Sequence, residues 1–104
     1  MRRGEVWWAD MPQPAGARPV LLLSRQKAID VRSHVTVCPL TRTVREIPSE
    51  VPLAPSDGVP KACAANLDTL QTIPKALLRE RLCLLSPSKL RAVAEALKFS
   101  LDLP

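Results

Sequence analysis

An arginine and a threonine in the first half of the chain have side chains suited to handling a phosphodiester. Arg18 precedes Pro19, which restricts the backbone beside it, and its planar guanidinium offers fixed donors to two phosphate oxygens. Thr41 offers a hydroxyl that can bond a phosphate oxygen or an attacking hydroxyl. Together they could stabilise the charge that develops when a phosphodiester is cut. Two plainer roles remain open: an ion pair of Arg18 with Glu5 or Asp10, and a Thr41 hydroxyl that only caps a strand end.

The other residues with reactive side chains are few. His34 is the single histidine, so a two-histidine acid–base pair cannot form within one chain. Cys38, Cys63 and Cys83 are widely spaced, odd in number and without the paired spacing of zinc ligands. We therefore expect no metal site and three buried free thiols, with a catalytic thiol as the minor alternative.

The positive charge of the chain is concentrated in one segment. The net charge is +5, and residues 18–45 hold six basic residues and one acid, while the rest of the chain is balanced. The six are Arg18, Arg25, Lys27, Arg32, Arg42 and Arg45. A basic segment of this kind predicts a polyanionic partner, with nucleic acid first among the candidates. A solvated basic face with no partner is the alternative.

Trp7 and Trp8 are the only tryptophans, and they are neighbours in a strand-like segment. Because successive side chains of a strand point to opposite faces, we expect one in the core and the other facing outward. The outward ring could anchor a partner protein, since aromatic residues often dominate interfaces. Burial of both rings through a bulge is the alternative.

Short strands must position these residues, because eleven prolines in 104 residues leave little room for long elements. The apolar pattern predicts strands at 5–9, 20–24, 35–40, 47–53, 62–67 and 81–85, with burial on both faces for 20–24 and an edge position for 47–53. We expect a turn at residues 56–58 and a short helical turn after Pro74.

A helix is predicted only at the C-terminus. Ser86 is a plausible N-cap, Pro87 suits the first turn, and apolar residues recur at helical spacing. They are Leu90, Val93, Ala94, Leu97 and Leu101. The chain length predicts a single domain, 1–104, and the strand spacing favours a mainly β fold, a closed or nearly closed antiparallel barrel carrying this helix. No apolar run is long enough to span a membrane and no signal segment is visible, so we expect a cytoplasmic protein.

Three segments resemble the MazF/PemK-type toxins of type II toxin–antitoxin systems. The opening "RRGEVWWADMP" followed by "GARPVLLLS" is similar to the first two strands of that family. "VTVCPLTRT", residues 35–43, resembles its third strand, and "ANLDTLQTIPKALLRERLCLLSPSKL", residues 65–90, resembles its late segment. The segments occur in the family's order and cover nearly the whole chain.

The resemblance implies a small SH3-like antiparallel barrel with a C-terminal α-helix, the CcdB/PemK-like toxin fold, and a homodimer with an RNA groove along its interface. It implies an endoribonuclease that cuts single-stranded RNA at a short motif by 2′-hydroxyl attack, needs no metal or cofactor, and is inhibited by a cognate antitoxin. Arg18 and Thr41 match catalytic positions. The expected RNA-binding residues are Arg25, Arg42, Arg45, Asn66 and Asp68.

Three alternatives to these roles stay open. Asp68 can be a turn-former just past a strand rather than part of a strip shared with Asn66. The whole protein can be a CcdB-like toxin that acts on DNA gyrase by protein contacts, because fold alone does not fix function. It can also be an RNA-binding barrel without enzymatic activity.

Overall fold

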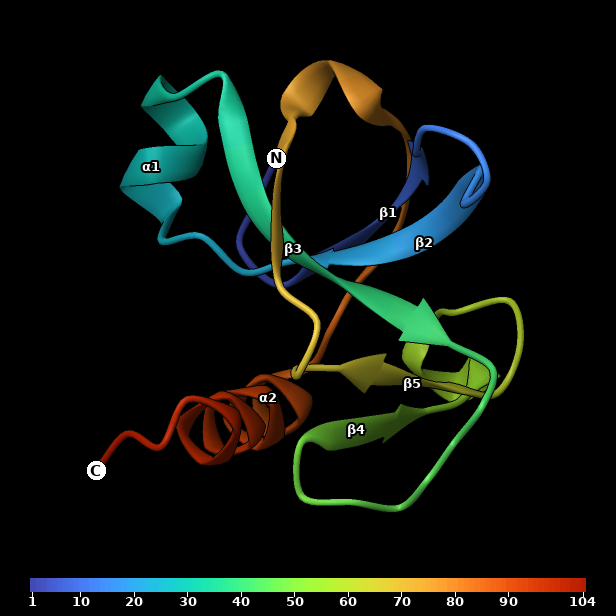
Figure 1. Ribbon diagram of the computed structural model, residues 1–104, viewed down its shortest axis with the longest axis vertical. Coiled ribbons are helices and arrows are strands. Elements are labelled where there is room, and N and C mark those ends of the chain that lie inside the picture. Colours follow the sequence, from blue (N-terminus) through green and yellow to red (C-terminus); the bar gives the residue numbers. More distant parts are fainter.

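The computed structural model describes residues 1–104, and β-strands dominate it (Figure 1). The strands are β1 (Glu5–Asp10), β2 (Ala17–Leu22), β3 (His34–Thr41), β4 (Glu50–Leu53), β5 (Cys63–Asn66), β6 (Gln71–Pro74) and β7 (Leu78–Leu84). The helices are α1 (Gln26–Val31) and α2 (Pro87–Ser100), with 3₁₀ turns at Pro55–Asp57 and Lys75–Leu77. No helix is both long and apolar enough to cross a membrane.

The strands form one antiparallel sheet with the order β4-β5-β3-β2-β1-β7, and β6 pairs with β3 beside this path. The mainly β fold with a C-terminal helix is thus confirmed. The sheet is not closed, however, because β4 and β7 lie at its two ends and do not pair with each other. β4 has only four residues, and Pro52 in it has no N–H to donate, so the sheet ends there as the edge position predicts.

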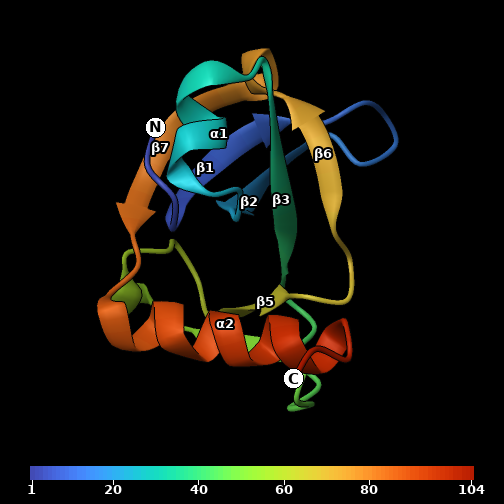
Figure 2. The same ribbon diagram turned by 90° about the vertical axis from the view of Figure 1, so that its left-hand side faces the viewer.

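Strand β3 joins the two halves of the molecule. Its first half, 34–37, pairs with β6, residues 37–39 pair with β2, and Leu40 and Thr41 pair with β5. Figure 2 shows β3 running from the layer of β1, β2, β6 and β7 down to β5, beneath which α2 lies. The end of β3 is therefore where the two layers meet.

Two clusters of buried hydrophobic residues form the core of the protein. Leu21 belongs to the cluster that also contains Val93 of α2, and Val20 and Leu22 belong to the cluster that also contains Ile29 of α1. The predicted burial on both faces is confirmed for residues 20–22, whereas Leu23 and Ser24 of the predicted strand follow the end of β2 and are half-buried.

Helix α2 begins as predicted. The Ser86 hydroxyl accepts a hydrogen bond from the backbone N–H of Lys89 at 3.2 Å, and Pro87 occupies the first turn. Val93 is buried, while Leu90 and Leu97 pack against the larger core. Leu101 was expected on the same face, but it follows the last helical residue and is 51% exposed.

The sequence pattern missed two elements, α1 and β6. Helix α1 has six residues, no side-chain cap and no acid in its first turn, so none of the usual start signals is present. β6 has four residues and ends in Pro74, and it is held mainly by pairing with β3. The short helical turn expected after Pro74 is confirmed.

A buried carboxylate ties β1 to β7. Glu5 has a 5% exposed side chain and accepts hydrogen bonds from Arg81 Nε at 2.6 Å, Trp7 Nε1 at 3.1 Å and Arg2 N at 2.8 Å. Burial raises the pKa of Glu5, but these hydrogen bonds and the Arg81 charge outweigh it, so the pKa lies below its ordinary value of 4.5.

Replacing Glu5 by Gln is expected to lower the free energy of unfolding at neutral pH by about 1 to 2 kcal/mol, because the charge-assisted bonds are lost. A lowered folded-state pKa contributes stability that is present above pH 4.5 and is lost as the pH falls through the folded-state value. The difference between wild type and Glu5→Gln in urea denaturation should therefore shrink in acid. Glu95→Gln, whose side chain is 75% exposed, is the matched control. An equal difference at both pH values would contradict this account.

Candidate active site

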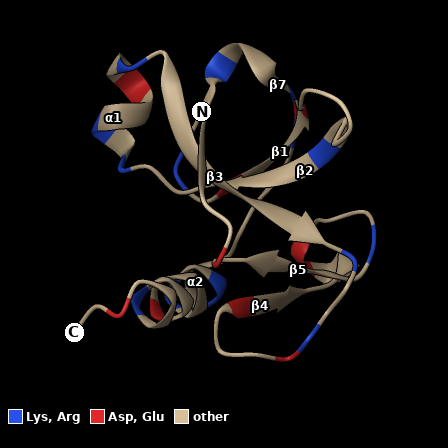
Figure 3. Cartoon of the chain, in the orientation of Figure 1, with Lys and Arg blue, Asp and Glu red and all other residues tan.

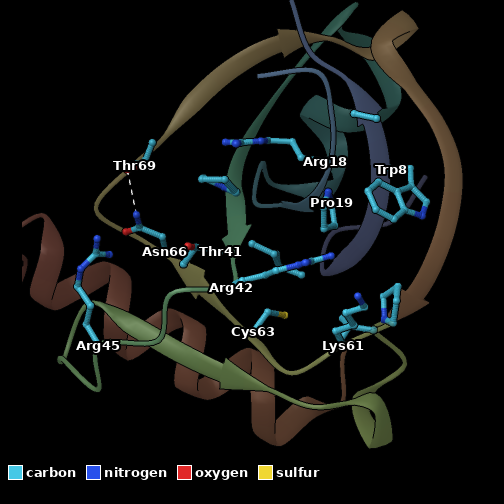
Figure 4. Close-up of a pocket in the computed structure, with 15 residues that line it drawn as sticks. Trp8, Arg18, Pro19, Thr41, Arg42, Arg45, Lys61, Cys63, Asn66 and Thr69 are labelled. Carbon is cyan, nitrogen blue, oxygen red and sulfur yellow. Dashed lines mark hydrogen bonds between the residues drawn. The ribbon is translucent and has the colours of Figure 1, made fainter. Parts of the chain in front are cut away.

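A cleft of about 610 Å³ opens where β2 and β5 diverge from β3 (Figure 4). Residues of β1, β2, the end of β3 and β5 line it. The loop after β3, the loop before β5 and the turn after β5 complete the lining. The lining residues are Trp8, Ala17, Arg18, Pro19, Pro39, Leu40, Thr41, Arg42, Arg45, Val59, Pro60, Lys61, Cys63, Asn66 and Thr69.

Arg18 and Thr41 each lie two residues beyond the last residue pair between β2 and β3, which is Val20 with Pro39. Ladder pairing with β2 has stopped before this point, while Thr41 still pairs with Ala64 of β5 on the other edge of β3. The two side chains therefore flank an opening rather than a closed sheet, and both line the cleft.

Arg18 is exposed and makes no ion pair or side-chain hydrogen bond. The two carboxylates that could have held it are taken by other arginines, Glu5 by Arg81 and Asp10 by Arg79. The alternative of a structural ion pair is therefore wrong, and the guanidinium is free to bind an anion.

Thr41 has the plainer of its two expected roles and also lines the cleft. Its Oγ1 accepts a hydrogen bond from the backbone N–H of Thr43 at 3.2 Å, which caps the end of β3. Because that bond uses a lone pair, the hydroxyl proton remains available as a donor toward the cleft.

Four cations and no carboxylate line the cleft: Arg18, Arg42, Arg45 and Lys61. Figure 3 shows the basic residues of β2, of the loop after β3 and of the loop before β5 on one side of the molecule. Arg42 and Lys61, like Arg18, form no ion pair, so their charge is available to an anion. The sequence analysis did not identify Lys61 as a cleft residue, because it lies in the charge-balanced part of the sequence. Only its position in the loop before β5 indicates that it lines the cleft.

Arg45 differs from the other three because a buried carboxylate holds it. Glu50 Oε1 accepts the backbone N–H of Arg45 at 2.8 Å, and Glu50 Oε2 lies 3.5 Å from Arg45 Nη1. The Glu50 side chain is 1% exposed and Oε2 has no hydrogen-bond partner, so the buried charge is compensated by the Arg45 guanidinium and by the single hydrogen bond to Oε1. Glu50 thus fixes the loop after β3 and offsets part of the Arg45 charge.

Asn66 lies in the cleft and Asp68 does not. β5 ends at Asn66, whose Oδ1 accepts the Asp68 backbone N–H at 3.0 Å and whose Nδ2 donates to Thr69 Oγ1 at 3.1 Å. The Asp68 carboxylate instead accepts the buried Ser49 hydroxyl at 2.5 Å. The expectation that Asn66 and Asp68 share one strand face is wrong, because the chain turns between them, and the turn-forming alternative describes Asp68.

Arg25 also lies outside the cleft. It precedes α1, at the opposite end of β2 from Arg18, and does not contribute to the lining. The basic segment seen in the sequence is therefore split in space between the cleft and the neighbourhood of α1.

The tryptophans divide as the alternation predicts. Trp7 packs against the smaller core and donates to Glu5, while Trp8 lines the cleft. The alternative with both rings in the core is wrong.

The cysteines are buried and free, which confirms the expected role as small apolar residues. Burial raises the pKa of all three thiols, that of Cys38 to about 12. Cys63 lines the cleft, but with a raised pKa it is poorly suited to act as a nucleophile.

Comparisons with known proteins agree with this geometry. Residues 2–101 match the family model described as the PemK-like, MazF-like toxin of type II toxin–antitoxin systems. The probable endoribonuclease MazF5 of Mycobacterium tuberculosis (strain ATCC 25618 / H37Rv) is 43% identical over 101 residues, covering 96% of this chain and 92% of that protein.

Two solved structures are also similar. The Mycobacterium tuberculosis toxin MazF-mt6 superposes with a TM-score of 0.88 at 34% identity, covering 96% of this chain and 98% of that one. A mycobacterial endoribonuclease in complex with its cognate antitoxin gives a TM-score of 0.90 at 30% identity, covering 100% and 97%.

The free cations of the cleft predict salt-sensitive binding of a single-stranded oligonucleotide. Arg42→Gln and Lys61→Gln should each reduce the slope of log affinity against log salt by about 0.7, the value for one phosphate contact. Arg45→Gln should have a smaller effect, because Glu50 already pairs with Arg45. Fluorescence anisotropy with a 2′-O-methyl oligonucleotide measures the slopes, with Arg25→Gln as the control outside the cleft. An effect of Arg25→Gln equal to that of Lys61→Gln would contradict the assignment.

Proposed function

The chain belongs to the PemK-like, MazF-like family of type II toxins, and we propose that it is a toxin endoribonuclease that cuts single-stranded RNA by attack of a ribose 2′-hydroxyl on the adjacent phosphate. The observation that carries this proposal is that Arg18 and Thr41 line the same cleft, together with three further cations and no carboxylate. Among the relatives named above, MazF5 is described as a probable endoribonuclease and the mycobacterial protein bound to its antitoxin as an endoribonuclease. Neither gyrase binding nor RNA binding without cleavage has an observation in its favour.

The reaction forms one bond and breaks another at the same phosphorus. The 2′-oxygen attacks the phosphorus, the bond to the 5′-oxygen breaks, and the products are a 2′,3′-cyclic phosphate and a 5′-hydroxyl. The 2′-hydroxyl loses its proton and the departing 5′-oxygen gains one. Negative charge accumulates on the non-bridging oxygens in the transition state, and the Arg18 guanidinium is placed to stabilise it.

The other lining residues bind and orient the substrate. The Thr41 hydroxyl donates to a phosphate oxygen or to the attacking hydroxyl, while Arg42, Arg45 and Lys61 hold neighbouring phosphates. Asn66 offers an amide to a base edge. Since neither histidine nor carboxylate lines the cleft of one chain, catalysis by this chain's residues depends on charge stabilisation and orientation more than on acid–base side chains.

The proposal includes two protein partners. A homodimer would extend the cleft of each chain, and a cognate antitoxin would block it. The unpaired cations suit an antitoxin tail with acidic and apolar residues, which would compete with RNA for the same charges. We place the protein in the cytoplasm, where cellular RNA is found and where free thiols such as Cys38 stay reduced.

Arg18→Ala is expected to lower the cleavage rate by about a hundred- to a thousandfold, because one preorganised charge at the transition state is lost. Binding of an uncleavable oligonucleotide should fall by less than about tenfold, since the other cations remain. Gel assays of a single-stranded RNA in EDTA measure the rate, and Arg25→Ala is the control. Unchanged cleavage by Arg18→Ala would contradict the proposal, and no cleavage by wild type together with gyrase inhibition would favour the gyrase-directed alternative.

Thr41→Val should slow cleavage by about tenfold or more, because the hydroxyl donor is lost, whereas Thr41→Ser should retain most of the activity. The Val variant also loses the cap on the Thr43 N–H, which should cost about 1 kcal/mol of stability. Thermal melts measured beside the kinetics separate the two effects. Equal activity of the Val and Ser variants would remove Thr41 from the mechanism.

A further inference from the structure

A second cavity, of about 310 Å³, adjoins the cleft behind Trp8 and Ala17. Trp8 and Ala17 line both spaces, and Asp10, Arg79 and Glu80 complete the second one. Figure 4 places Trp8 at the end of the cleft near Lys61, away from Arg45 and Asn66. An RNA strand bound along the cations of the cleft would therefore reach Trp8 at this end.

Strand pairing sets Glu80 beside the Trp8 ring. Trp8 on β1 pairs with Pro19 of β2 on one side and with Glu80 of β7 on the other. Directly paired residues of antiparallel strands have Cβ atoms about 5 Å apart, so the Glu80 carboxylate lies within reach of a group stacked on the indole.

The polar groups of this cavity are not equally available. Arg79 Nη1 donates to both oxygens of Asp10, at 3.1 and 3.3 Å, so that pair is satisfied. Glu80 is exposed and forms no ion pair or side-chain hydrogen bond, and the Trp8 indole N–H has no acceptor. The cavity thus offers an aromatic ring, one free carboxylate and one free donor.

This combination fits a nucleobase. A tryptophan face stacks any base, and a carboxylate with two free oxygens accepts a pair of neighbouring N–H donors. Guanine alone among the four RNA bases presents two adjacent donors, N1–H and the N2 amino group, on its Watson–Crick edge.

We propose that the cavity of Trp8, Asp10, Ala17, Arg79 and Glu80 is a guanine subsite, in which the base of a nucleotide next to the cleaved bond stacks on Trp8 and bonds Glu80. The inference rests on the proposed function, because it assumes RNA in the adjoining cleft. It assigns part of the sequence preference of cleavage to a place separate from Arg18 and Thr41.

The first test compares cleavage motifs by mapping the 5′ ends of a random-sequence RNA after digestion. Wild type should show one enriched guanine near the cut. Glu80→Gln replaces one acceptor by a donor, so it should reduce that preference by about tenfold while cleavage persists. Trp8→Leu should slow cleavage at guanine sites by about tenfold, and Trp8→Phe, which keeps an aromatic face, should restore it. Glu95→Gln on α2 is the charge-matched control.

The second test reads the subsite without catalysis. In a Trp7→Phe background Trp8 is the only tryptophan, so its fluorescence reports a base stacked on it. A 2′-O-methyl oligonucleotide containing one guanine should quench this fluorescence, and replacing that guanine by inosine, which lacks the N2 amino group, should weaken binding by about tenfold. In Glu80→Gln the inosine penalty should largely vanish.

The outcomes separate this inference from the proposed function. A wild-type motif without guanine, or an unchanged motif in both Glu80→Gln and Trp8→Leu, overturns the subsite while Arg18-dependent cleavage still supports the nuclease. If Trp8→Leu loses antitoxin binding or dimerisation while the cleavage motif is unchanged, the guanine subsite is overturned in favour of a protein interface at Trp8. Absence of cleavage by wild type counts against the nuclease itself, and an inosine penalty in the fluorescence titration would then still support the subsite.

Discussion

Between Pro39 and Leu40, strand β3 stops pairing with β2 and begins pairing with β5. Pro39 has no N–H to donate, and neither does Pro19 on the facing strand, so the ladder loses donors where the strands separate. The cleft lies beyond the last pair of β2 and β3, Val20 with Pro39, and both Arg18 and Thr41 line it. An uninterrupted ladder at this point would have filled the site with paired backbone.

The buried carboxylates decide which arginines remain free. Glu5 binds Arg81 and Glu50 binds Arg45, and both glutamate side chains are at most 5% exposed. The first pair joins β1 to β7, and the second fixes the loop after β3. Arg18, Arg42 and Lys61 have no such partner. A concentration of unpaired cations has a cost in self-repulsion, and a bound polyanion would relieve it, which is a physical reason for a cleft of this kind to bind nucleic acid.

Much of the fold was predictable because it depends on local patterns. The alternation of Val51, Pro52 and Leu53 predicted an edge strand, the apolar run at 20–24 predicted burial on both faces, and Ser86 with Pro87 predicted the start of α2. Helix α1 and strand β6 were not predictable in this way, since each is too short to carry a periodic signal and each is held by packing or pairing with β3.

The sequence by itself determined the types of the side chains that we propose for catalysis, the prolines near them and the excess of positive charge, because these are properties of residues and their neighbours. Only the tertiary structure decided which charges meet. Lys61 lines the same cleft as Arg18, whereas Arg25 lies at the opposite end of β2. The Asp68 carboxylate binds Ser49 and does not line the cleft with Asn66. Those outcomes depend on strand register and on where a strand ends, and both are set by pairing between segments far apart in the chain.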